Sequence, residues 1–295
     1  MADTRFQGSM VALVTPFKNG KVDEVALRAL VDWQIAEGTD AIVPCGTTGE
    51  SATLNYEEHD RVIRIVVEQA RKKVPVLGGT GSNATTEAIE ITRHAQKAGA
   101  DGSLQVTPYY NKPTQEGLYL HFKAIAEAVS SMPILLYNVP GRTSVNLLPE
   151  TVARLAKISN IVGIKEASGN LEQVKKLIDL CGPDFTVLSG EDAQNFEILE
   201  LGGRGMISVT ANVVPGTLAT LWNSYKSGKK GPAKKIHEEL LPLHQAMFFE
   251  TNPIPVKTSL GLMGKCSAEM RLPLCEMGKE NRERLLKVLK EYKLV

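Results

Sequence analysis

The chain has 295 residues, of which 43% are hydrophobic and 23% are charged, and its formal net charge is +1. This length allows one large domain or two ordinary ones, and the composition is typical of a soluble globular protein. The balanced charge argues against nucleic acid or an acidic membrane surface as a partner. No apolar stretch approaches the length of a membrane span, so we expect no membrane partner either.

The four cysteines are widely spaced and form neither a CxxC pair nor a cluster with histidines. The five histidines are also scattered, and none of them ends a predicted strand. We therefore expect no structural zinc, no other bound metal and no cofactor. The first five residues lack the basic and apolar blocks of a signal peptide, so we expect free thiols in a reducing cytoplasm.

Eight short apolar segments are predicted to be strands. They cover residues 10–14, 40–44, 74–77, 102–106, 133–137, 161–164, 185–188 and 205–209. Helical patterns separate most of them, and three of these helices have capping residues: Asp23, the pair Asn55 and Glu58, and the pair Asn170 and Gln173. Eight such units predict an α/β protein with a (β/α)8 TIM barrel. A doubly wound open sheet is the alternative, but the GxGxxG fingerprint is missing after the first strand.

The last third of the chain has helical spacing and no further strand pattern, from about residue 217 to residue 292. Because eight strands already close a barrel, we expect two or three additional helices outside it. The predicted organisation is a barrel over residues 1–215, followed by a helical extension over residues 216–295 that packs on the barrel.

Lys165 directly follows the predicted strand 161–164, a short β-branched run that is typical of a buried parallel strand. Burying a lysine there is costly unless its amine is paired or neutral. A neutral amine attacks carbonyl groups, so this position suggests Schiff-base chemistry. The alternative is a buried stem whose charged head reaches water or a carboxylate.

The loop of residues 46–51 (GTTGES) follows the second predicted strand, at the barrel end where active sites lie. The hydroxyls of Thr47 and Thr48 stand between glycines and lead toward a helix N-terminus, an arrangement that suits an anion. The loop lacks the lysine of a phosphate-binding loop, which favours a carboxylate as the bound group. An ordinary glycine-rich turn is the alternative.

Two further strand ends carry polar side chains, with Tyr110 after the fourth predicted strand and Tyr137 and Arg142 at the fifth. Tyrosine hydroxyls can pass protons, and arginine binds carboxylates bidentately. A single tyrosine is more often a packing residue, but together with Lys165 at the same rim these side chains indicate an active site. Residues 202–205 (GGRG) precede the eighth strand, so we interpret them as a turn at the opposite rim.

Four motifs carry a resemblance to a known family. They are residues 46–51 (GTTGES), 106–111 (VTPYYN), 137–143 (YNVPGRT) and 163–167 (GIKEA). The chain resembles the dihydrodipicolinate synthase family of pyruvate-dependent class I aldolases, to which N-acetylneuraminate lyase also belongs. The similarity covers essentially the whole chain and extends to residues 190–192 (GED) and 252–257 (NPIPVK).

The resemblance implies that pyruvate condenses with L-aspartate 4-semialdehyde to 4-hydroxy-tetrahydrodipicolinate, the cyclic precursor of diaminopimelate and lysine. By this resemblance Lys165 forms the imine with pyruvate, and Thr47 and Thr48 hold the pyruvate carboxylate. Gly190 and Ile207 are the other implied substrate contacts.

The resemblance also implies a proton relay in which Tyr137 moves protons and Thr48 links it to Tyr110 of a neighbouring subunit. Arg142 is expected to receive the carboxylate of the semialdehyde. The family is usually a homotetramer built as a pair of tight dimers, so we expect this assembly here.

L-Lysine is the expected feedback inhibitor, bound in a cleft at the tight-dimer interface. The residues that match the lysine contacts of sensitive family members are Ser51, Ala52, His59, Gly81, Asn83, Glu87 and Tyr109. Tyr56 stands where several of these members have a histidine, so one contact is altered. The alternative is that these residues only cap helices and pack the interface.

Two other functions remain open at this point. A sugar-acid aldolase of the N-acetylneuraminate lyase type would share the lysine and the tyrosine, but Arg142 would be out of place in a polyol pocket. A keto-acid sensor without catalysis would be favoured only by a missing member of the proton relay, and all of its members are present.

Overall fold

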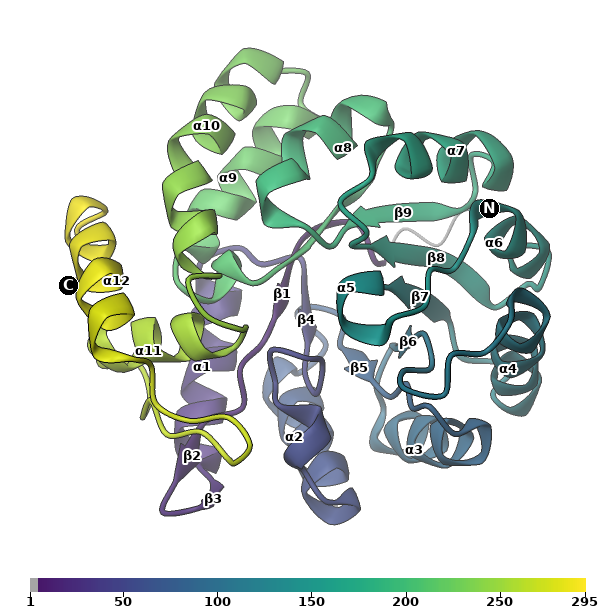
Figure 1. Ribbon diagram of the computed structural model, residues 1–295, viewed down its shortest axis with the longest axis horizontal. Coiled ribbons are helices and arrows are strands. Elements are labelled where there is room, and N and C mark those ends of the chain that lie inside the picture. The colour runs from purple at the N-terminus through teal and green to yellow at the C-terminus, as the bar shows by residue number, and fades with distance from the viewer. Residues whose placement is uncertain (1–4) are drawn as a thin grey trace.

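The structure is a computed structural model that describes residues 5–295. Eight parallel strands form one sheet in the order β4-β1-β10-β9-β8-β7-β6-β5, and a parallel bridge between Ile42 and Val76 joins its two edges (Figure 1). The expected TIM barrel is therefore confirmed. The strands are β1 (Gly8–Ala12), β4 (Ala41–Val43), β5 (Leu77–Gly79), β6 (Gly102–Val106), β7 (Ile134–Asn138), β8 (Ile161–Glu166), β9 (Thr186–Ser189) and β10 (Gly205–Ser208).

The third barrel strand starts later than predicted, at Leu77 instead of residue 74. The proline at position 75 has no backbone N–H to donate, although its carbonyl accepts a hydrogen bond from Ile42 N at 3.1 Å. The GGRG segment is the expected turn, because α8 (Asn195–Leu201) ends at Gly202 and β10 begins at Gly205.

A helix follows each barrel strand and packs on the outside of the sheet (Figure 1). These helices are α1 (Glu24–Ala36), α2 (Tyr56–Ala70), α3 (Thr85–Ala98), α4 (Gln115–Ala128), α6 (Pro149–Leu155), α7 (Leu171–Cys181), α8 and α9 (Pro215–Lys226). Shorter turns of helix are α5 (Pro140–Thr143), η1 (Ser51–Thr53), η2 (Asp192–Gln194) and η3 (Thr210–Asn212).

The predicted helix caps are largely confirmed. The Asp23 carboxylate accepts from Ala26 N, and the Asn55–Glu58 capping box is complete. The third box is only half formed: Asn170 Oδ1 accepts from the backbone of Gln173 at 3.1 Å, but the Gln173 side chain bonds elsewhere.

A two-stranded hairpin was not predicted. It consists of β2 (Phe17–Lys18) and β3 (Lys21–Val22), joined by Asn19 and Gly20, which both have positive φ. An Asn-Gly pair is the usual signal for such a turn. The Glu269 carboxylate accepts from the backbone N–H groups of Asn19 and Gly20, so the C-terminal part of the chain fixes this hairpin.

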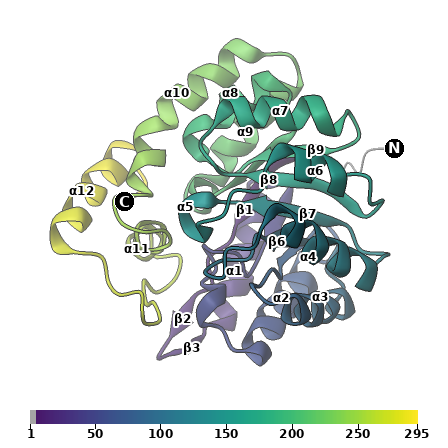
Figure 2. The same ribbon diagram turned by 45° about the vertical axis from the view of Figure 1, so that its right-hand side comes forward.

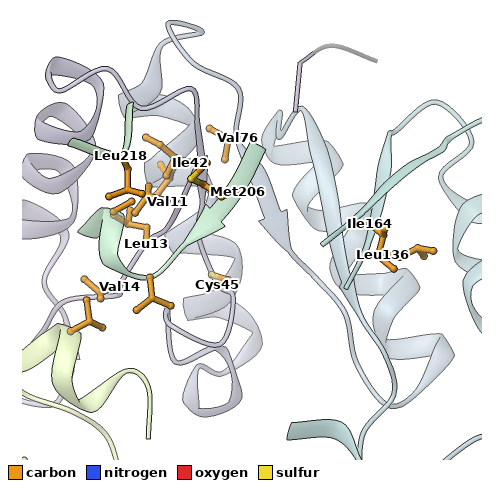
Figure 3. Packing of buried hydrophobic residues seen from close by; sticks show 14 of the residues in the cluster. Val11, Leu13, Val14, Ile42, Cys45, Val76, Leu136, Ile164, Met206 and Leu218 are labelled. Carbon is orange, nitrogen blue, oxygen red and sulfur yellow. The ribbon is translucent and has the colours of Figure 1, made fainter. Parts of the chain in front are cut away.

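Alternate strand residues supply two separate cores, as expected for a barrel. Between the barrel and its helices lie Val11, Ile42 and Leu218, which gather in Figure 3. The barrel interior is filled by the opposite set of side chains. Its members include Met10, Ala12, Ala41, Val43, Leu77, Leu104, Leu135, Tyr137, Leu188 and Ile207.

Three helices follow the eight strand–helix units, and Figure 2 shows α11 and α12 at one side of the molecule. They are α10 (Lys230–Ala246), α11 (Ile254–Leu262) and α12 (Lys279–Glu291). The expected boundary after residue 215 falls at the start of α9. This helix packs against β1, and it follows the last barrel strand as the other barrel helices follow theirs.

No helix among residues 5–295 is both long and apolar enough to span a membrane. The expectation about a signal peptide concerned residues 1–5, and all but the last of these lie outside the described residues.

Candidate active site

Lys165 belongs to β8 itself, which continues to Glu166 rather than ending at residue 164. Strand register places it beside Tyr137 of β7 and Leu188 of β9, and both neighbours belong to the interior core. Because side chains alternate along a strand, Ile164 points to the outer core and Lys165 points into the barrel. The lysine is only 5% exposed.

The amine of Lys165 lies beside an aromatic ring. Its Nζ lies 4.4 Å from the centroid of the Tyr137 ring, and within residues 5–295 it forms no salt bridge or side-chain hydrogen bond. A Cβ atom at Gly190 would lie 2.9 Å from the Lys165 Cε, so the glycine leaves room for the lysine. Within the described residues no carboxylate forms an ion pair with this amine, and Glu191 interacts with it only at longer range.

A cavity of about 510 Å³ opens above Lys165 at the carboxyl ends of the strands. Most of the side chains predicted to bind substrate meet there. The cavity lining includes Thr47, Thr48, Tyr137, Arg142, Lys165, Gly190 and Ile207. These residues belong to five of the eight barrel strands or to the loops that follow them, and all of them line this one cavity.

Thr48 and Arg142 are connected through Asn252, a residue to which the sequence assigned no role. Asn252 Nδ2 donates to Thr48 Oγ1 at 3.0 Å, and the Asn252 carbonyl accepts from Arg142 Nη2 at 3.2 Å. The first contact leaves the hydroxyl proton of Thr48 free to be donated into the cavity. Thr47 is the more exposed of the two threonines.

Two carboxylates near Lys165 were also missed. Glu166 points away from the cavity and accepts from Ser168 N at 2.7 Å and from the Asn138 amide, although burial raises its pKa. Glu191 lines the cavity. Burial raises the pKa of Glu191, and the charge of Asp192 adds to this, whereas Lys165 opposes it. Because side chains alternate along a strand, the inward direction expected for Lys165 could have predicted that Glu166 points outward.

Tyr110 is not among the residues that line this cavity. Its side chain is 89% exposed and its φ is 74°, in the left-handed region that a bulky residue rarely adopts. An exposed aromatic ring on a strained turn suits contact with another molecule.

The sequence pattern of the dihydrodipicolinate synthetase family matches residues 5–292. The chain belongs to this family. The resemblance carried by the motifs is thus confirmed. A relative from Geotalea uraniireducens, named 4-hydroxy-tetrahydrodipicolinate synthase, is 61% identical over 290 residues, which cover 98% of this chain and 100% of the relative.

Solved structures of this family superpose closely on the chain. The chloride-inhibited dihydrodipicolinate synthase from Acinetobacter baumannii, complexed with pyruvate, has a TM-score of 0.96 and 48% identity, covering 98% of this chain and 99% of that one. The enzyme from Cyanidioschyzon merolae with lysine bound has a TM-score of 0.95 and 41% identity, with the same coverage.

Only some of the residues expected to bind lysine form hydrogen bonds with one another. Asn83 Nδ2 donates to the Tyr109 carbonyl at 3.2 Å. Ser82 and Tyr56 both donate to the Glu87 carboxylate, and these bonds hold its pKa below the usual range. Tyr56 thus contacts Glu87, one of the residues expected to contact lysine.

The other residues expected to contact lysine lie in a short helical turn, in the buried core or in a tightly packed loop. Ser51 and Ala52 lie in η1, ahead of α2. His59 is buried against the barrel, and this burial lowers its pKa. At Gly81 a Cβ atom would lie 2.4 Å from Val106 N, so this position needs a glycine for packing.

Proposed function

We propose that the chain condenses pyruvate with L-aspartate 4-semialdehyde to 4-hydroxy-tetrahydrodipicolinate through an imine on Lys165. The observation that carries the proposal is a buried amine without a carboxylate partner, beside Tyr137, at the base of a cavity with hydroxyl and guanidinium donors. The name of the curated relative supports this function and gives no support to a sugar-acid aldolase.

The chemistry begins with attack of the Lys165 amine on the keto carbon of pyruvate, which forms an imine and releases water. Loss of a methyl proton gives an enamine, whose carbon bonds to the aldehyde carbon of the second substrate while the aldehyde oxygen gains a proton. The amino group of that substrate then attacks the imine carbon, closes the ring and displaces the lysine.

The protein groups supply binding and proton transfer. Thr47 and Thr48 are proposed to hold the pyruvate carboxylate, and the contact from Asn252 supports Thr48 as a donor. Tyr137 is proposed to move the protons, with Thr48 as the link toward Tyr110. Arg142, at the mouth of the cavity, is the proposed ligand of the semialdehyde carboxylate.

The substrate assignment predicts an uneven effect of Arg142→Ala. We expect the KM for the semialdehyde to rise at least about tenfold, since a charge-assisted bidentate contact is lost, while imine formation with pyruvate changes little. The measurement is pyruvate consumption with aspartate semialdehyde, with N-acetylmannosamine and with neither. The assignment would be contradicted if pyruvate were consumed with N-acetylmannosamine but not with aspartate semialdehyde. It would also be contradicted if Arg142→Ala impaired imine formation with pyruvate selectively.

A homotetramer of two tight dimers is the proposed assembly, with Tyr110 completing the relay of the partner subunit. The exposure of its ring and its absence from the lining of its own subunit's cavity support this. Mixing inactive Tyr110→Phe and Lys165→Ala subunits should restore part of the activity, because a mixed dimer contains one site with both residues. No recovery after confirmed subunit exchange would refute a shared site.

Feedback inhibition by L-lysine is proposed at the cluster around Glu87, as the lysine-bound relative supports. Calorimetry should show lysine binding that pyruvate modulates, because coupling between two sites is reciprocal. Glu87→Gln should weaken binding by about tenfold to a hundredfold through loss of a charged partner. Glu90→Gln, one turn along α3, is the matched control. If both changes weaken lysine binding equally, or if millimolar lysine does not bind, the residues around Glu87 only pack the subunit interface.

A cytoplasmic location is proposed as well. All four cysteines are unpaired in the structure, which supports a reducing compartment.

A further inference from the structure

A buried ion pair joins the loop of residues 46–51 to the C-terminal helices. Lys257 Nζ in α11 lies 2.5 Å from Glu50 Oε1, and neither side chain has any exposed surface. The other oxygen, Glu50 Oε2, accepts from Arg271 N at 3.2 Å. The Phe17 ring also covers the amine, with its centroid 4.0 Å from Lys257 Nζ.

Stability alone is a weak reason for such a pair. Removing two charges from water costs several kcal/mol, and hydrophobic residues of similar size are often neutral or stabilising replacements. Fixing the geometry of nearby residues is a role that a buried pair can fill and an apolar contact cannot, because the pair has a defined direction.

The geometry that this pair fixes is that of the two substrate-binding threonines. Glu50 closes a turn by donating its N–H to the Thr47 carbonyl at 3.1 Å, and its φ of 53° lies in the left-handed region. Thr48 is thus held inside a turn whose last residue is anchored by Lys257. The turn just ahead of α11 contacts Thr48 directly, through Asn252.

We propose that Lys257 is a positioning residue for pyruvate, which acts through Glu50 to hold the Thr47 and Thr48 hydroxyls toward the carboxylate of the bound keto acid. This inference rests on the proposed function, because it requires that the loop binds pyruvate. The C-terminal extension already lines the cavity at residues 248 and 250–252, and the proposal gives it a second role there.

The test compares Lys257→Met with the double variant Lys257→Met/Glu50→Gln. The single variant leaves a buried carboxylate unpaired, so its melting temperature should fall and its KM for pyruvate should rise at least about tenfold. The KM for the semialdehyde should change less than about threefold. In the double variant, which buries no charge, the melting temperature should recover and the KM for pyruvate should remain raised.

The double variant separates positioning from stability even where the single variant does not fold. Recovery of the KM for pyruvate together with the melting temperature would overturn the proposal, as would equal increases of KM for both substrates. Arg154→Met is the matched control, since it breaks the exposed pair with Glu116. Imine formation by the unmodified enzyme, measured in the same series, shows separately whether the proposed function holds.

Discussion

Replacing Lys165 by alanine should lower turnover by at least about ten-thousandfold, because no covalent intermediate can form without the amine. The cavity and the fold should persist, since the lysine forms no salt bridge with the described residues around it. Steady-state consumption of pyruvate in the presence of the semialdehyde measures the loss.

Lys165→Arg is the sharper companion, because it places a permanent positive charge at this position and removes the nucleophilic amine. It should be as inactive as the alanine variant. Lys175→Ala, at an exposed position of α7, should retain full activity. Turnover by Lys165→Arg within about tenfold of the unmodified enzyme would mean that charge rather than covalent chemistry matters here.

Tyr137→Phe should lower turnover by about a hundredfold to ten-thousandfold, the usual effect of losing a general acid–base. The ring that packs over Lys165 and fills the interior core is kept, so the melting temperature should change little. Rate measurements under saturating concentrations of both substrates report the loss of proton transfer without a contribution from binding.

Tyr119→Phe, on α4 and outside the cavity, is the matched control and should keep normal activity. Thr48→Val and Thr47→Val extend the test. If Thr48 links the relay, its variant should lower turnover, and if a threonine only holds pyruvate, its variant should raise the KM for pyruvate. Near-normal turnover of Tyr137→Phe would exclude the relay.

Much of the site could be predicted because a barrel gathers the carboxyl ends of its strands. Lys165 and Tyr137 are 28 residues apart in the sequence, but neighbouring parallel strands place them side by side. The same rule brought Thr48 and Arg142 to one rim.

The contacts that support the site could not be predicted in this way. Asn252 meets Thr48 across 204 residues, and Lys257 meets Glu50 across 207. The helical spacing of the C-terminal part predicts helices and their apolar faces, but it contains no register that places them on a particular loop. Gln173 likewise fitted a capping box, yet its Oε1 accepts from Asn146 Nδ2 at 2.8 Å and its amide nitrogen donates to Glu166, so the side chain turns away from the helix N-terminus.

The most direct test of the account is borohydride reduction in the presence of pyruvate, followed by peptide mapping. We expect the peptide containing Lys165 to gain the mass of one reduced pyruvate adduct, and no adduct to form in Lys165→Arg. An adduct on any other lysine, or full turnover without an adduct, would contradict it.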